Sequence, residues 1–125
     1  MKIGGNIFTE SFISIQIKDE KITIQGNLKL STLQKIKKTL LAPSIMGGFA
    51  YIPKMECYHG VISMNHELQG TLKINDEKIE FTNGKGYIEK DWGTSFPKEY
   101  MWMQSNHFKK PSTSLFFQLL ISYFI

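Results

Sequence analysis

The sequence predicts an all-β protein whose antiparallel strands form a barrel or a sandwich. Hydrophobic and polar residues alternate along most of the 125-residue chain, and short turn-forming segments interrupt the alternation. The length fits one domain, residues 1–125, with one hydrophobic core. The contents of 42% hydrophobic and 21% charged residues are typical of a globular chain, which excludes disordered and collagen-like proteins.

The first predicted hairpin joins residues 13–17 to residues 22–30. Ile13, Ile15 and Ile17 alternate with polar residues, a charged turn follows, and the alternation resumes after it. Gly26 is predicted to mark a bulge in the second strand.

Residues 31–41 change period, because Leu33, Ile36 and Leu40 stand at helical spacing. Ser31 and Gln34 would form a capping box. This segment is therefore either a short helix or an irregular connection. Residues 42–53 contain a Gly-Gly pair and two prolines and are predicted to be a loop, of the kind that forms a lid or the mouth of a site.

The second half of the chain continues in short alternating segments bounded by turn residues. Further strands are predicted at residues 55–65, 70–74, 79–81, 87–93, 99–108 and 114–125, with turns at residues 75–78 and 83–86.

The run from residue 114 to residue 125 is apolar on both strand faces, which is typical of a buried central strand. Its dozen residues are fewer than the roughly twenty that a membrane-spanning helix needs. The run has no turn or polar tail after it, so we expect a fold that is incomplete at its C-terminus. An open apolar edge there would favour self-association.

Composition excludes several functional classes. All 15 basic residues are lysine and exceed the 11 acidic residues by 4, which fits a solvated surface better than nucleic-acid recognition by arginine. The single Cys57 excludes an internal disulfide framework. The N-terminus lacks a secretory signal, so a cytoplasmic protein is expected. No metal, nucleotide or other cofactor is indicated, since the Cys57–His59 pair has no third ligand at suitable spacing.

The densest chemistry lies in residues 84–108. If the chain is extended there, Tyr87, Glu89 and Asp91 project from one strand face. A carboxyl group in an apolar, aromatic pocket is pushed toward its neutral form and can act as an acid. The alternative is that Glu89 and Asp91 point to solvent and pair with neighbouring lysines.

The next strand places aromatic and amide side chains on one face: Tyr100, Trp102, Gln104 and Asn106. Buried amides require hydrogen-bond partners, and either a bound ligand or the neighbouring loop backbone could supply them.

Residues 86–108 resemble the signature of the tocopherol cyclase-like family. The matching pattern is Tyr-x-Glu-Lys-x-Trp-Gly, then Phe-Pro, then Trp-x-Gln-x-Asn-x-Phe. The resemblance extends back through residues 55–61 and 4–8 and ends near Phe117. It implies the first part of a longer protein built from lipocalin-like β units, such as a truncated bacterial member.

The resemblance implies an isomerase that cyclises a prenylated quinol without a cofactor. A proton is delivered to a trisubstituted olefin, and the ring hydroxyl captures the tertiary cation to close a chromanol. It would make Glu89 the proton donor and Asp91 a helper or an alternative donor. Substrate-binding roles would fall to the aromatic residues Tyr87, Trp92, Tyr100 and Trp102 and to the amides Gln104 and Asn106.

Two other functional hypotheses are compatible with the sequence. The same aromatics could line the pocket of a non-catalytic lipocalin-like binder of an apolar ligand, with peripheral membrane contact but no transmembrane segment. The remaining hypothesis is an inactive truncated fragment, because an incomplete sheet exposes an apolar edge that favours self-association over folding.

Overall fold

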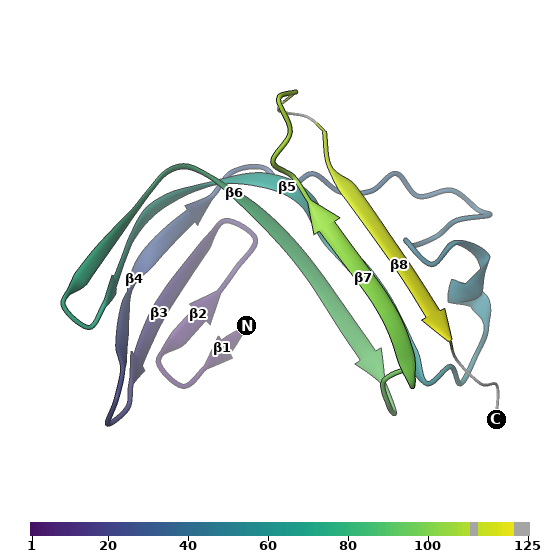
Figure 1. The fold of residues 1–125 in the computed structure, drawn as a ribbon, viewed down its shortest axis with the longest axis horizontal. Coiled ribbons are helices and arrows are strands. Elements are labelled where there is room, and N and C mark those ends of the chain that lie inside the picture. The colour runs from purple at the N-terminus through teal and green to yellow at the C-terminus, as the bar shows by residue number, and fades with distance from the viewer. Residues whose placement is uncertain (111–112, 122–125) are drawn as a thin grey trace. The chain divides into compact units, whose positions relative to one another are not determined.

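The computed structural model describes residues 1–110 and 113–121, whose regular structure is almost entirely β-strand and includes no α-helix. The predicted fold class is therefore confirmed as all-β with antiparallel sheets (Figure 1). No helix in these described residues is long and apolar enough to cross a membrane.

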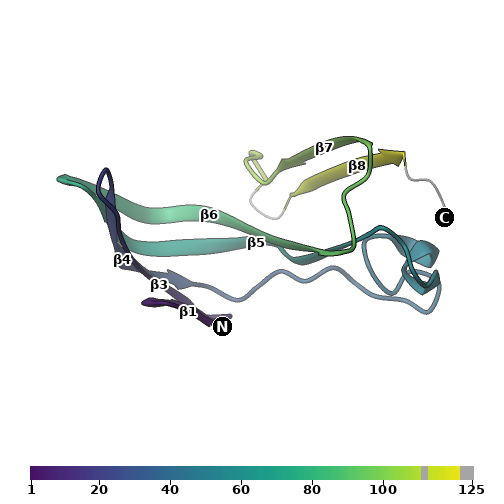
Figure 2. The same cartoon turned by 90° about the horizontal axis from the view of Figure 1, so that it is seen from below.

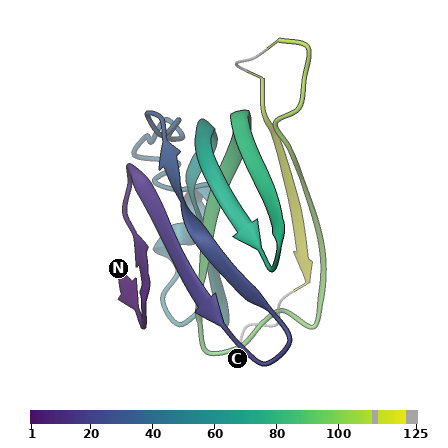
Figure 3. The same ribbon diagram turned by 90° about the vertical axis from the view of Figure 1, so that its left-hand side faces the viewer.

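The strands form one six-stranded and one two-stranded sheet. The larger sheet has the order β1-β2-β3-β4-β5-β6, and β7 pairs with β8 in the smaller one. The bounds are β1 (Lys2–Ile3), β2 (Asn6–Phe8), β3 (Phe12–Lys18), β4 (Thr23–Leu30), β5 (Cys57–Ile74), β6 (Glu77–Gly93), β7 (Glu99–Ser105) and β8 (Leu115–Ile121). Figure 3 shows β3, β4, β5 and β6 running next to one another, as consecutive neighbours should.

The chain packs as two compact units that share the two longest strands. Unit 1 comprises Met1–Leu33 and His66–Gly86, and unit 2 comprises Gln34–Asn65 and the described residues from Tyr87 onward. The outer halves of β5 and β6 near their connecting turn belong to unit 1, and the other halves belong to unit 2.

The β3–β4 hairpin is confirmed, but the bulge expected at Gly26 is wrong. The register runs without interruption from Phe12 opposite Lys29 to Lys18 opposite Thr23. Gly26 has φ 153°, and a Cβ atom there would lie 2.1 Å from the carbonyl oxygen of Thr71 on β5. Glycine is required because the neighbouring backbone approaches too closely for any side chain.

The expected tight turn at residues 83–86 is also wrong, since β5 and β6 are continuous strands of 18 and 17 residues joined by a short turn (Figure 2). Asn75 forms that turn with φ 53°, and its Oδ1 accepts a hydrogen bond from the backbone N–H of Thr23 at 2.8 Å. Asn83 also adopts a left-handed conformation, φ 58°, inside β6. Asparagine tolerates this conformation, so the strand continues through it.

Residues 31–39 form no helix, which settles the alternative in favour of an irregular segment. The backbone N–H of Gln34 donates to Asn65 O, and Gln34 O accepts from Met64 N–H at 2.9 Å. The Ser31 hydroxyl accepts from the backbone N–H of Glu67 at 2.8 Å. Backbone groups that a helix would use internally are therefore bonded to β5, so long-range pairing overrides the local helical spacing.

The predicted loop at residues 42–53 is confirmed and contains one turn of 3-10 helix, η1 (Gly47–Tyr51). Two hydrogen bonds attach the loop to β5. The backbone N–H of His59 donates to Met46 Sδ at 3.1 Å, and the Tyr58 hydroxyl donates to Ile52 O at 2.8 Å.

Strands β7 and β8 pair from Glu99 opposite Ile121 to Ser105 opposite Leu115. The strand expected from residue 99 thus ends three residues earlier than predicted. The even-numbered face of β8 is partly buried, whereas its odd-numbered face is exposed, in contrast to the buried central strand that was expected. Residues 122–125 of the predicted strand lie outside the described residues.

The side chains buried most completely are unusually polar. Leu28, Leu30 and Cys57 are the buried hydrophobic residues of the described chain. The buried polar residues are His59, Ser63, Asn65, His66 and Asn106, four of which lie on β5. Buried polar groups need compensating hydrogen bonds, so their concentration on one strand directs attention to the chemistry around it.

One of these residues gives a prediction for stability. His66 is 5% exposed, and burial lowers the pKa of its imidazole below the ordinary value of 6.5. Above pH 6.5 neither the folded nor the unfolded chain protonates this group. Below it, the unfolded chain binds a proton that the folded chain does not, so the free energy of unfolding falls until the folded-state pKa is reached.

Denaturant midpoints measured on both sides of pH 6.5 check this expectation. A His66→Gln variant should show a flatter pH dependence than the natural chain. An identical acid-induced fall in both proteins would show that other groups cause it.

Candidate active site

Glu89 and Asp91 lie on β6 in unit 2 and line the same cavity, which has a volume of about 250 Å³. Strand β5 contributes Cys57 and His59 to its wall. The other lining residues come from the segment before β7 and from β7 and β8: Phe96, Pro97, Tyr100, Trp102, Gln118 and Leu120. Two carboxylates and one imidazole therefore face a cavity whose remaining walls are largely aromatic and apolar.

The carboxyl group of Glu89 is held by two donors that both use its Oε2 atom. The Tyr87 hydroxyl donates to it at 2.7 Å, and the Trp102 indole N–H donates to it at 3.1 Å. The rings of Tyr87 and Trp102 are tilted by 59° with centroids 6.5 Å apart. Because both donors bind one oxygen, the other oxygen of Glu89 can carry a proton without breaking either bond.

The side chain of Glu89 is 30% exposed, so it lies in the cavity wall and not in bulk solvent. It contacts the indole of Trp102. Strand β7 supplies this indole because Trp102 and Tyr100 share the face that also lines the cavity.

His59 connects the two carboxylates. Its Nδ1 atom is 2.5 Å from Asp91 Oδ1, and its Nε2 atom is 3.6 Å from Glu89 Oε2. The side chain is 2% exposed, and its ring stacks on Phe116 with centroids 5.1 Å apart. Nε2 has no hydrogen-bond partner among the described residues. A buried ring nitrogen without a partner, facing a carboxylate across a cavity, is suited to exchange a proton with it or with a bound ligand.

Two pKa shifts describe the polarity of the cavity wall. Burial, together with the hydrogen bond to Glu89, raises the pKa of the Tyr87 phenol, so Tyr87 stays protonated and remains a donor. Burial is the main cause that raises the pKa of the Cys57 thiol, and the negative charge of Asp91 raises it further. Cys57 is therefore a poor nucleophile at neutral pH, and it serves as an apolar part of the wall.

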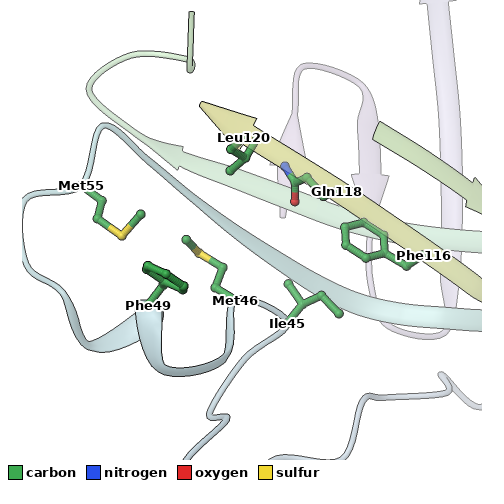
Figure 4. A pocket seen from close by; sticks show the side chains of 7 residues that line it. All are labelled: Ile45, Met46, Phe49, Met55, Phe116, Gln118 and Leu120. Atoms are coloured by element: carbon green, nitrogen blue, oxygen red, sulfur yellow. The ribbon is translucent and has the colours of Figure 1, made fainter. Parts of the chain in front are cut away.

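A second, larger cavity of about 360 Å³ lies within unit 2 and shares Gln118 and Leu120 with the first. Figure 4 shows Met46, Phe49 and Met55 on the loop side of this cavity and Phe116, Gln118 and Leu120 on β8. Six of its seven lining residues are apolar, Ile45 being the sixth. The two cavities thus form a polar and an apolar site that share one wall.

Three residues predicted for the site lie elsewhere. Trp92 faces away from the carboxylates and stacks on Tyr58 at 5.5 Å, with the Lys90 ammonium 4.5 Å from its ring centroid. Neither Gln104 nor Asn106 lines either cavity. Asn106 is buried beyond the end of β7, and Gln104 Nε2 has no hydrogen-bond partner among the described residues.

His59 is the functional candidate that sequence reasoning missed. Its signal in the sequence is the strand face that it shares with Cys57, a pair that lacks a third metal ligand. Its proximity to Asp91 depends on how β5 pairs with β6. The sequence predicted two separate strands where the structure has β5, so it could not predict this pairing.

The last glycine of the sequence motif has a structural explanation. Gly93 ends β6 with φ 158°, and a Cβ atom there would lie 2.1 Å from Glu56 O. The motif thus combines Glu89, which lines the cavity, and Tyr87, which donates a hydrogen bond to its carboxyl group, with a glycine that permits close backbone approach.

Comparison with known sequences now identifies the family. A sequence model described as Tocopherol cyclase-like matches residues 23–117, well over half of the chain. The chain belongs to the tocopherol cyclase-like family. The matched region contains the carboxylates, His59 and the aromatic strand that carries Trp102.

Two relatives within the tocopherol cyclase-like family come from cereals. A rice protein named "Probable tocopherol cyclase, chloroplastic" (Oryza sativa subsp. japonica) is 32% identical over 69 residues, which are 55% of this chain and 15% of the rice protein. A maize protein named "Tocopherol cyclase, chloroplastic" (Zea mays) is 32% identical over 65 residues, 52% of this chain and 14% of the maize protein. The aligned part thus spans about one seventh of each relative. No solved structure matches the chain.

Proposed function

We propose that this chain cyclises a prenylated quinol, or a related isoprenoid lipid, with Glu89 as the proton donor. The observation that carries the proposal is the carboxyl group of Glu89, which lies in an aromatic cavity with Oε2 held by Tyr87 and Trp102. Membership of the tocopherol cyclase-like family supports the same chemistry.

The proposed reaction forms a C–H bond and a C–O bond, and it consumes the π bond of the olefin and the O–H bond of the quinol. Glu89 donates its proton to the CH carbon of a trisubstituted olefin, and the adjacent carbon becomes a tertiary cation. The face of Trp102 can stabilise this cation, because the negative face of an aromatic ring attracts positive charge. An oxygen lone pair of the quinol then forms the C–O bond that closes the chromanol ring.

The phenolic proton released by ring closure must return to the acid for the next turnover. His59 stands between the two carboxylates, with Nδ1 on Asp91 and Nε2 3.6 Å from Glu89. We expect Asp91 to hold the imidazole in position, and His59 to pass the proton back to Glu89. Substrate and product are isomers, so the cycle consumes no proton and needs no cofactor.

The two cavities, which share Gln118 and Leu120 in their walls, suit the two halves of such a substrate. The quinol ring, with its hydroxyl groups, fits the cavity that contains Glu89 and His59. The isoprenoid tail fits the apolar cavity between β8 and the loop that carries Met46 and Phe49 (Figure 4). Ligand sites of this kind are mostly apolar with a few well-placed polar groups.

The direct test is to incubate the purified chain with a prenylated hydroquinone in D₂O. Proton transfer from Glu89 predicts a chromanol with one deuterium, on the carbon next to the ring-closing carbon. A chromanol without deuterium at that carbon would exclude protonation of the olefin by an exchangeable acid. Mass spectrometry of the product measures the outcome.

A further inference from the structure

The net positive charge of the chain comes from one segment. Residues 31–54 contain four lysines and no acidic residue. The rest of the chain has 15 − 4 = 11 lysines and 11 acidic residues, so its formal charge is zero. The overall charge of +4 is therefore the charge of residues 31–54, which we call the basic segment.

The same segment presents two leucines to solvent. Leu40 and Leu41 are each 85% exposed, more than any other large hydrophobic side chain among the described residues. They occupy the tip of a tight turn, residues 39–42, which we call the leucine turn. Thr39 and Ala42 exchange backbone hydrogen bonds at 3.0 and 3.2 Å across it, and the Tyr51 hydroxyl donates to Leu40 O at 2.7 Å. The leucines are thus held outward by an ordered turn.

Aromatic residues of η1 extend this exposed surface. Phe49 is 58% exposed and Tyr51 is 59% exposed. Phe49 also lines the apolar cavity together with Ile45 and Met46 of the same segment (Figure 4). The basic segment therefore forms both an exposed apolar surface and one wall of the cavity.

The combination of charge and exposure points to one kind of partner. Two neighbouring leucines that are each 85% exposed are unfavourable on a surface that contacts only water. A buried protein interface is also unsuitable for them, because Lys37 and Lys38 lie directly beside them in the sequence. Lysines next to protruding leucine and aromatic side chains match an anionic bilayer, where cations approach the headgroups and apolar groups enter the acyl boundary. Tyrosine is also favoured at this interface.

We propose that the leucine turn docks unit 2 on an anionic lipid bilayer. Leu40 and Leu41 enter the boundary between headgroups and acyl chains, and Lys37 and Lys38 lie beside the lipid phosphates. This goes beyond the proposed cyclisation and does not depend on it. If both hold, the wall formed by Phe49 lies where a lipid substrate leaves the bilayer.

Vesicle co-sedimentation of the full chain tests the docking. We expect binding to vesicles of phosphatidylcholine with phosphatidylglycerol, and much weaker binding to phosphatidylcholine alone. Each lysine removed in Lys37→Gln and Lys38→Gln should weaken binding about fivefold, and added salt should weaken it further. The double variant Leu40→Ser, Leu41→Ser should lose roughly tenfold or more, since the inserted apolar area is removed.

The matched control is Lys18→Gln with Lys21→Gln, which removes the same charge from the exposed β3–β4 turn of unit 1. It should bind vesicles like the natural chain. All variants change exposed residues, and equal thermal unfolding of each confirms that the fold is kept.

Three results would overturn the docking proposal. The natural chain could fail to bind anionic vesicles, or the control variant could weaken binding as much as the Lys37→Gln, Lys38→Gln variant. The third result is a dimer of the natural chain in sedimentation velocity together with a monomeric Leu40→Ser, Leu41→Ser variant. A second copy of the chain would then cover the leucine turn. None of these measurements involves turnover, so each leaves the proposed cyclisation to its own test.

Discussion

Glu89→Gln is expected to lower the turnover of a prenylated hydroquinone by about a thousandfold, in the range typical of a lost general acid. Glutamine keeps the size of the side chain, and its oxygen can still accept the hydrogen bonds from Tyr87 and Trp102. Substrate affinity should therefore stay within a few-fold of the natural value. Chromanol formation measures turnover, and quenching of the Trp102 fluorescence by bound substrate measures affinity.

Glu99→Gln is the matched control for this variant. Glu99 is the first residue of β7, is exposed, and lines neither cavity. It should turn over substrate at the natural rate. Undiminished turnover in Glu89→Gln would eliminate Glu89 as the acid, whereas ligand binding without turnover in the natural chain would favour a non-catalytic binder.

His59→Asn is expected to lower kcat by about a hundredfold and to leave KM nearly unchanged. The asparagine amide can still donate to Asp91 in place of Nδ1, but it has no atom at the position of Nε2 and cannot carry a proton. The fall in kcat at a nearly constant KM indicates a role in returning the proton. A purely structural role for His59 would lower stability and impair substrate binding as well.

His107→Asn serves as the control, because His107 is exposed and outside the lining of both cavities. It should keep the natural kcat and KM. If His59→Asn also keeps the full kcat, the phenolic proton returns to Glu89 by another path.

The local pattern of the sequence predicted those parts of the fold that local rules determine. Period-two alternation located the β3–β4 hairpin and placed Tyr87 and Glu89 on one face, where a hydrogen bond now joins them. The same rule places Trp92, an even-numbered residue, on the opposite face from Glu89, as the structure shows. Trp92 was assigned to the site because it belongs to the family motif, although its even position on the strand predicts the opposite face.

Long-range pairing explains what the sequence did not reveal. The helical spacing in residues 31–41 is real, but hydrogen bonds of Ser31 and Gln34 to β5 hold the segment in an irregular conformation instead. The glycines near Asn83 suggested a turn, although β6 runs through them. The contact of His59 with Asp91 joins residues 32 positions apart, and no local pattern encodes it.

The two cavities have Gln118 and Leu120 of β8 in common. In the proposed function, these two side chains would touch both the aromatic ring of the substrate and the start of its hydrocarbon chain. Selectivity for the substituents of the ring and selectivity for the length of the hydrocarbon chain would then have to evolve together, since a change at either position alters the fit of both. We expect members of the family that differ in one preference to differ in the other.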